Sequence, residues 1–225
     1  TADTYKVIAN PYPSILDTEE LVAANSGSKV WLLDPSLGAL GAYVTYDGTN
    51  WSVATASADK NIQSGQGFIV KSSGTSFVIS ESNKTTGFST YWLSRNNYAS
   101  ATTTTNADKI RLTLHKNVNN EWQLLDGALA VNSSNGNNAV DATDATKISN
   151  FNESLMFFNG TSNLAIEYRN LPEENQVQPI KMTGTTVASY QIRISAENYQ
   201  NSDLIPVLED TLLNTSTEIP VDGTV

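Results

Sequence analysis

Apolar and polar residues alternate strictly in three segments of the second half of the chain. These segments span residues 110–115, 164–169 and 190–195, and in each of them Ile, Leu or Tyr occupies every other position. Successive side chains of a strand point to opposite faces, so this period places one face in a core and the other in solvent. The pattern predicts three strands of antiparallel sheet.

Shorter apolar runs predict five more strands in the first half of the chain. They span residues 29–33, 43–46, 51–54, 67–71 and 76–80. Asp47-Gly48 separates the second run from the third, and Ser73-Gly74 separates the fourth from the fifth. Pairs of this kind, ending in glycine, mark tight hairpin turns. The sequence therefore predicts two hairpins in this half.

One segment carries the signals of a helix. Asp17 is a good N-cap residue, and Glu20 lies three residues later, as in a capping box. Gly27 can end the helix, because glycine readily adopts the left-handed conformation found there. These signals predict one short helix near residues 18–25.

Small polar residues dominate the composition. Of 225 residues, 25 are Thr, 24 are Ser and 24 are Asn, while charged residues make up 16%. Ser, Thr and Asn side chains compete with the backbone for hydrogen bonds, which disfavours helices. Together with many short strands between turn signals, this composition predicts an all-β fold, an antiparallel β-sandwich or jelly roll made of two packed β modules.

A Thr-rich stretch at residues 99–107 predicts a loop or linker between the two modules. Residues 1–106 carry 6 basic and 8 acidic side chains, whereas residues 107–225 carry 7 and 15. We therefore expect an N-terminal β module at 1–98 and a more acidic C-terminal β-sandwich module at 108–225, truncated at its end. A single sandwich with a long connecting loop is the alternative.

The charge and the residue inventory exclude several classes of function. The formal net charge of −10 leaves no basic footprint for a nucleic acid, and it disfavours anionic membranes. No run approaches 18 apolar residues, so no membrane insertion is expected. The chain has no cysteine, which excludes disulfides, thiol nucleophiles and Cys-ligated metals.

The sequence contains no catalytic motif, and we predict that the chain is not an enzyme. The single histidine, His115, is expected on the solvated face of a strand, and no Gly-x-Ser-x-Gly accompanies it. The run Gly65-Gln66-Gly67-Phe68 leads into a strand, whereas phosphate loops need a helix N-terminus. A glycosidase fragment remains an alternative, because glycoside hydrolysis needs two carboxyl groups whose separation in space a sequence does not show.

Four residues form a candidate ligand platform. Trp51 follows the first predicted hairpin turn, beside Tyr46, Asp47 and Asn50. The CH face of a sugar ring is apolar and its rim forms hydrogen bonds, so aromatic rings beside amides and carboxylates suit a glycan. The alternative is that these aromatic residues belong to a sheet core, where such residues are enriched.

Asp141 and Asp144 form a candidate metal site. They lie three residues apart in a loop beside Asn137 and Asn138, and hard oxygen ligands of this type can bind a structural Ca²⁺. No EF-hand pattern is present, and no other cofactor is expected. The alternative is a structural turn, with Asp144 capping a short helical turn that leads to Lys147.

Two motifs predict structural corners. In Asn10-Pro11-Tyr12-Pro13-Ser14 each proline fixes its own φ and biases the residue before it to an extended conformation. This segment should lead a strand at residues 5–9 into the helix, with Tyr12 packed on a sheet. The run Gly65-Gln66-Gly67-Phe68 should be a tight turn that places Phe68 in a core.

The same two motifs carry a resemblance to a known family. Asn10-Pro11-Tyr12-Pro13-Ser14, then Val30-Trp31, then residues 65–71 resemble a β-domain found near the C-termini of large secreted and cell-surface proteins of the Bacteroidetes. Later segments of this chain, at residues 111–114, 141–147, 163–166 and 207–210, follow in the expected order. The chain departs from the family at Ala9, where glycine is usual, and at its end, where the family runs on into a further strand and a sorting signal.

The resemblance implies a location and an architecture, and no catalytic residue. Such proteins resemble exports of the type IX secretion system, so we expect an extracellular or cell-surface fragment of a longer bacterial protein. The expected role is a non-catalytic structural or adhesive β module, whose partners are neighbouring domains of the same polypeptide or cell-surface components. A carbohydrate-binding module, with a glycan on an aromatic platform, is the alternative.

Overall fold

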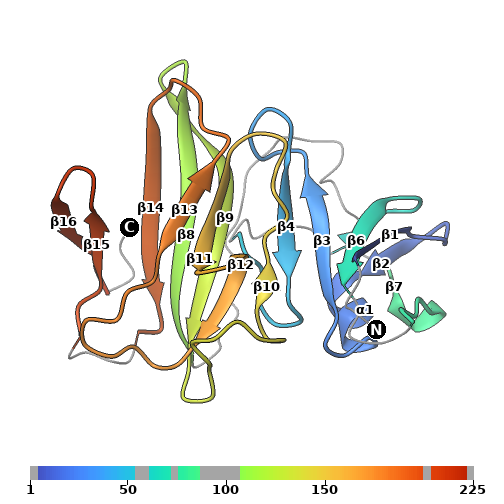
Figure 1. The fold of residues 1–225 in the computed structure, drawn as a ribbon. Coiled ribbons are helices and arrows are strands. Elements are labelled where there is room, and N and C mark those ends of the chain that lie inside the picture. Colours follow the sequence, from blue (N-terminus) through green and yellow to red (C-terminus); the bar gives the residue numbers. More distant parts are fainter. Residues whose placement is uncertain (1–4, 54–60, 72–75, 87–106, 200–203, 222–225) are drawn as a thin grey trace.

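The computed structural model describes residues 5–53, 61–71, 76–86, 107–199 and 204–221. It consists of four β-sheets, one short α-helix and one 3₁₀ turn (Figure 1). Strands pair antiparallel throughout these residues, except that one pair, β9 with β12, is parallel. The prediction of an all-β, mainly antiparallel fold with one short helix is confirmed.

The first half of the chain forms two small sheets. One has the strand order β1-β6-β3-β4 and the other β5-β2-β7. The elements are β1 (Tyr5–Ala9), β2 (Ile15–Asp17), α1 (Thr18–Ala23), β3 (Lys29–Asp34), β4 (Ala42–Tyr46), β5 (Asn61–Ile62), β6 (Gly67–Lys71), η1 (Glu81–Asn83) and β7 (Lys84–Thr85).

Helix α1 forms for the predicted reasons. The Asp17 carboxylate accepts hydrogen bonds from the backbone N–H groups of Glu19 and Glu20, at 2.8 and 3.2 Å. These are two of the donors that a helix start leaves without a partner. The C-cap is Ala24 and not the predicted Gly27, which lies in the turn that follows and has a φ of 78° that an L side chain rarely adopts. The helix ends at Ala23, two residues before the predicted end.

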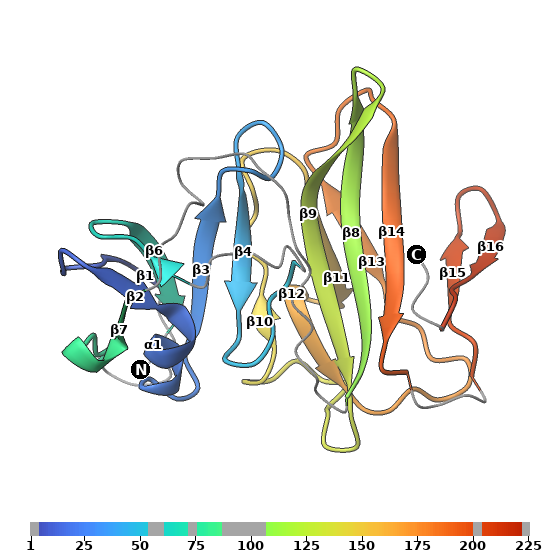
Figure 2. The same ribbon diagram turned by 180° about the vertical axis from the view of Figure 1, so that it is seen from behind.

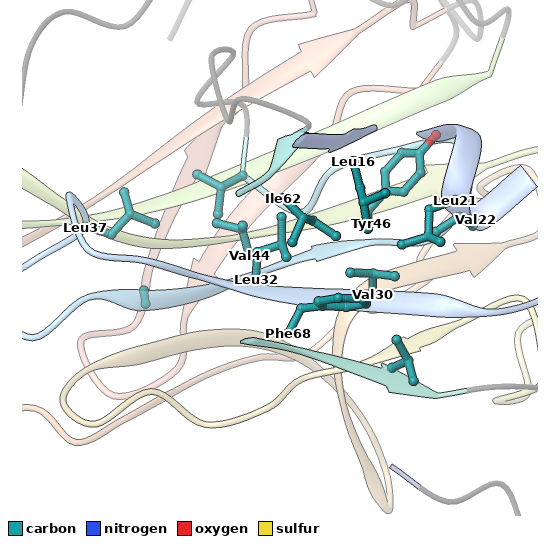
Figure 3. Close-up of a cluster of buried hydrophobic side chains, with 13 residues drawn as sticks. Leu16, Leu21, Val22, Val30, Leu32, Leu37, Val44, Tyr46, Ile62 and Phe68 are labelled. Atoms are coloured by element: carbon teal, nitrogen blue, oxygen red, sulfur yellow. The ribbon is translucent and has the colours of Figure 1, made fainter. Parts of the chain in front are cut away.

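A first hydrophobic core lies between these elements (Figure 3). Leu21 and Val22 enter it from α1, Val30 and Leu32 from β3, and Phe68 from β6. Tyr12 packs against the same core and is half-buried. The predicted core position of Phe68 and the predicted packing of Tyr12 are therefore confirmed.

The second half forms one large curled sheet, with the strand order β13-β11-β12-β9-β8-β14 and β10 paired to β12. Its strands are β8 (Asp108–Val118), β9 (Glu121–Asn132), β10 (Ala145–Thr146), β11 (Ser154–Asn159), β12 (Ser162–Arg169), β13 (Ile180–Thr183) and β14 (Tyr190–Glu197). A separate hairpin, β15 (Val207–Asp210) and β16 (Thr215–Glu218), follows and begins directly after Pro206. The three alternating segments lie in β8, β12 and β14, as predicted.

The centre of this sheet is covered on both faces. On β9, Ala128 and Ala130 belong to a second core, while Leu129 and Val131 belong to a third cluster. On β12, the residues predicted to face solvent are buried, with Glu167 only 1% exposed. A strand with one wet face was therefore the wrong expectation for β12, because neighbouring parts of the chain cover that face.

Three local predictions differ from the structure. Trp51 pairs with Tyr46 through a single bridge, so the described part of the first hairpin has a very short second arm. Residues 76–80 form no strand, because the Asn25 side chain bonds both the N–H and the C=O of Val78, each at 2.7 Å, in place of a ladder. Ala145–Thr146 is a strand, so Asp144 caps no helical turn.

The predicted linker lies outside the described residues, apart from Ala107. Strands before residue 87 and strands after residue 107 belong to different sheets. Figures 1 and 2 show that β4 of the first part stands beside β9 and β10 of the second. The division into 1–98 and 108–225 stays a prediction, and the contact between the two parts forms the candidate site.

Candidate functional site

The four predicted platform residues lie together at the end of β4. The rings of Tyr46 and Trp51 stack with their centroids 4.7 Å apart and an interplanar angle of 28°. Between them, the Asp47 carboxylate accepts hydrogen bonds from the N–H groups of Thr49 and Asn50, at 2.7 and 2.6 Å. The turn is therefore organised by Asp47, in agreement with the Asp-Gly signal.

The polar atoms of this turn bond to the other sheet. The Tyr168 hydroxyl, on β12, donates to Asp47 Oδ2 at 2.9 Å and accepts from Asn50 Nδ2 at 2.8 Å. Burial and the neighbouring Asp47 carboxylate both raise the pKa of Tyr168, so the hydroxyl keeps its proton and remains a donor. One phenol thus ties together two residues that lie more than a hundred positions away in sequence.

Further bonds cross between the same two parts of the chain. Lys29 Nζ donates to the Ala142 carbonyl at 2.6 Å, and Trp31 Nε1 donates to the Thr146 carbonyl at 3.0 Å. Arg111 Nη1 donates to the Trp51 carbonyl at 3.0 Å. Asn150 Oδ1 accepts a hydrogen bond from the Tyr43 N–H at 2.8 Å. We call this set of cross-sheet hydrogen bonds the seam. The side chains of the seam are Lys29, Trp31, Asp47, Asn50, Arg111, Asn150 and Tyr168.

Close backbone packing accompanies the seam. A Cβ on Gly127 of β9 would lie 2.9 Å from the Leu112 carbonyl oxygen of β8, and 3.3 Å from both the Ser52 carbonyl oxygen and a Val53 methyl group. Glycine therefore relieves a close approach to β8 and also leaves room for segment 51–53 against β9. On the same strand, the Leu124 carbonyl accepts a hydrogen bond from Gly38 N at 3.0 Å.

The predicted platform is largely covered. Tyr46 and Asn50 are each 4% exposed, and one face of the Tyr46 ring lies against Trp51. A sugar that stacks on a ring needs an exposed face of that ring. The four residues are brought together as predicted, and their polar atoms bond to the second sheet; a ligand role for them stays a prediction.

Removing the Tyr168 hydroxyl tests the seam. We expect Tyr168→Phe to lower the free energy of unfolding by about 1–3 kcal/mol, because Asp47 and the buried Asn50 each lose a partner. Tyr43→Phe is the matched control, since no described residue bonds the Tyr43 hydroxyl, and its effect should stay within about 0.5 kcal/mol. Urea unfolding measures both variants, and equal effects would contradict a role for the hydroxyl.

The candidate metal residues are occupied by hydrogen bonds. Asp141 accepts from the N–H and hydroxyl of Thr143 and from Asn137 Nδ2, at 2.6 to 3.1 Å. Asp144 accepts from the N–H groups of Asp141 and Tyr168, each at 2.8 Å. These bonds close the loop onto β12, and a cation would have to displace them. Within the described ranges, no three His, Asp or Glu side chains are grouped to hold a metal.

We expect Ca²⁺ to leave the melting temperature unchanged. A cation that binds only the folded state raises the melting temperature by mass action. Because all four carboxylate oxygens of Asp141 and Asp144 already accept hydrogen bonds, the thermal transitions in millimolar Ca²⁺ and in excess EDTA should coincide. A transition that rises with the Ca²⁺ concentration, and does not rise in Asp141→Asn, would show a metal site instead.

His115 is buried, which corrects the prediction of a solvent-facing residue. It is 8% exposed and pairs with Leu124 on the face of β8 where Leu124 meets the first core. Its Nε2 lies 3.1 Å from the Thr113 hydroxyl. Burial lowers the pKa of His115 to about 4. The imidazole therefore binds a proton more readily in the unfolded chain than in the folded protein. As a result, the contribution of His115 to the free energy of unfolding falls as the pH drops from about 6.5 to about 4.

The two structural motifs meet in space. Asn10 N donates to the Gln66 carbonyl at 3.0 Å, and Gly65 N donates to the Asn10 carbonyl at 3.2 Å. The buried Asn10 carboxamide nitrogen lies 2.7, 3.0 and 3.1 Å from the carbonyl oxygens of Ser14, Ile62 and Gln63. The predicted corners are thus two sides of one joint, held by Asn10.

Sequence reasoning missed three buried charged clusters. Asp126 and Lys147, at 0% and 1% side-chain exposure, form an ion pair of 2.5 Å in the core. Glu153 accepts from Lys116 and Tyr190, and Glu167 lies against Arg169. The available signal was a charged residue inside an apolar run, as in the segment 124–131 around Asp126.

No protein-family model, curated protein sequence or solved structure matches this chain. Within the part of the chain that the structure describes, no helix has the length and apolar character needed to cross a membrane.

Proposed function

We propose that this chain is a non-catalytic structural or adhesive β module of a larger bacterial protein that is exported to the cell surface. The observation that carries the proposal is the seam. Asp47, Asn50, Lys29 and Tyr168 are the kinds of side chain that build a reactive or binding site, and here their polar atoms join two sheets.

Stiffness is the property that the seam provides. Residues before and after the segment 87–106 are joined by both side-chain and backbone hydrogen bonds, and the side-chain bonds are partly buried. Two sheets joined in this way transmit force as one body, which suits a module placed between other domains or between the cell and its surroundings. The low charge content and the resemblance of the Asn10 and Gly65 motifs to exported β-domains support the same role.

A carbohydrate-binding module is the second candidate function. It needs an exposed aromatic ring with polar neighbours, and Trp122 meets that need better than the buried Tyr46. Binding of this kind is compatible with a structural role, because it uses a different part of the molecule from the seam.

Two experiments test the proposed function. The purified protein should show no turnover in panels of glycosidase, esterase and protease substrates, and antibodies raised against it should label intact cells or secreted material of the source bacterium. Turnover that a single Asp or Glu substitution abolishes would overturn the proposal. So would antigen confined to the cytoplasm.

A further inference from the structure

One face of strands β9, β8 and β14 carries the exposed Trp122, Gln191 and Arg193 and the half-buried Asn117, while His115, on the same face of β8, is buried. Cross-strand pairing aligns Trp122 with Asn117, and His115 with both Leu124 and Gln191. Residues two apart on a strand share a face. Trp122, Asn117, Gln191 and Arg193 therefore share one face, which we call the Trp122 face. Figure 2 shows the two strands β8 and β14 side by side.

Trp122 is the exposed tryptophan of the described chain. It is 42% exposed, whereas Trp31 is fully buried and Trp51 is only partly exposed and stacked on Tyr46. A large indole in solvent has no structural role that the described contacts account for. Scattered apolar side chains on a surface are ordinary, so the residues that share a face with Trp122 decide whether it marks a binding site.

The neighbours are neutral amides and one guanidinium. Arg193 Nε donates to Gln191 Oε1 at 3.1 Å, which orients both side chains. Within the described ranges, Arg193 forms no ion pair and nothing accepts from its terminal nitrogens or from Gln191 Nε2. Both Gln191 and Arg193 are exposed. They lie on β14, which is separated from Trp122 on β9 by strand β8, so these donors extend the face away from the ring.

We propose that the Trp122 face binds a neutral oligosaccharide. The indole would stack on the CH face of one sugar ring beside Asn117, while Gln191 and Arg193, two strands away, would form hydrogen bonds with hydroxyl groups of sugar units further along the oligosaccharide. Neutral sugars are favoured over acidic ones because the protein carries a net charge of −10. The same charge disfavours nucleic acids.

A protein partner is less well suited to this face. Its apolar part is Trp122, because Val118, which is 40% exposed at the turn, follows Asn117 directly and points to the opposite face. Stable protein interfaces bury about 1,200–2,000 Å² and centre on a larger apolar patch. A single exposed ring, with hydrogen-bond donors further along the same face, matches a short glycan better. The proposal rests on the second candidate function and is independent of the seam.

Calorimetric titration with defined glycans tests the proposal. The probes are the neutral oligosaccharides cellohexaose, xylohexaose, mannohexaose and laminarihexaose, and the acidic hexagalacturonate. We expect one of the neutral probes to bind, with Trp122→Ala weakening its affinity by about 30-fold or more, as truncation of an aromatic hot spot does. Trp122→Phe should retain part of the affinity. Phe151→Ala is the matched control, since Phe151 is 68% exposed and lies off this face.

Each outcome decides the proposal. Loss of binding in Trp122→Ala, with Phe151→Ala and Trp51→Phe unaffected and all circular dichroism spectra alike, supports it. Loss in Trp51→Phe alone would overturn it in favour of a platform at the seam. Binding of hexagalacturonate alone, or of none of the probes, would also overturn it, while the proposed structural function would stand.

Discussion

Replacing Lys147 by Met is expected to lower the free energy of unfolding by about 3–5 kcal/mol. The substitution leaves the Asp126 carboxylate, which is fully buried, without the ammonium group 2.5 Å away. Burial raises the pKa of Asp126, and the Lys147 charge together with the N–H groups of Gly127 and Leu155 opposes that rise. Without Lys147, the folded protein must either hold an uncompensated charge or bind a proton.

The control for this prediction is a lysine–carboxylate pair at the surface, in which Lys84 is 28% exposed and also lies over the Tyr12 ring. Lys84 bonds Glu81, whose side chain is 73% exposed, and exposed pairs contribute about 0–1 kcal/mol. Lys84→Met should therefore change stability by less than about 1 kcal/mol. In the double variant Asp126→Leu/Lys147→Met the loss should be smaller than in Lys147→Met alone. Equal losses for Lys84→Met and Lys147→Met in urea unfolding would contradict this account.

Replacing Asn10 by Ala is expected to lower the free energy of unfolding by about 3 kcal/mol, because buried acceptors that lose their donor cost about 1–3 kcal/mol each. The Asn10 side-chain nitrogen lies within hydrogen-bond distance of three carbonyl oxygens. Its Oδ1 accepts a hydrogen bond from the Tyr12 N–H at 3.0 Å. The joint between the two sequence motifs depends on this one carboxamide.

Two further variants separate the possible reasons for such a loss. Asn10→Asp keeps the acceptor for Tyr12 but turns a carboxylate toward three carbonyl oxygens, so its loss should be at least as large as that of Asn10→Ala. Asn135→Ala, at an exposed turn position, should change stability by less than about 0.5 kcal/mol. A stable Asn10→Asp variant would mean that the carboxamide nitrogen is not essential to the joint.

Local signals in the sequence predicted the elements well. The alternation in β8, β12 and β14, the Asp17 cap of α1 and the Asp-Gly turn after Tyr46 depend on residues within a few positions of one another. The failure at residues 76–80 has a tertiary cause, since Asn25 supplies the bonds that a neighbouring strand would have supplied. β-propensity is overridden in this way because it reflects context more than the backbone itself.

The role of the candidate site in joining the two sheets could not be predicted from the sequence. That Tyr46, Asp47, Asn50 and Trp51 lie together was predictable, because they are close in the sequence. Their partner, Tyr168, lies 121 positions from Asp47, and no local pattern distinguishes a tyrosine that closes a seam from one that fills a core. The burial of His115 escaped prediction for a related reason, because the face of β8 that alternation assigned to solvent is covered by a distant part of the chain.

We infer that the described residues before position 87 and those at 107–199 form one cooperative body joined by the seam. Differential scanning calorimetry of the intact protein tests it most directly, because a single unit gives a calorimetric enthalpy equal to the van't Hoff enthalpy. We expect one transition with this equality, shifted to lower temperature as a whole in Tyr168→Phe. Two separate transitions in the unmodified protein, with only one of them moved by Tyr168→Phe, would contradict the account.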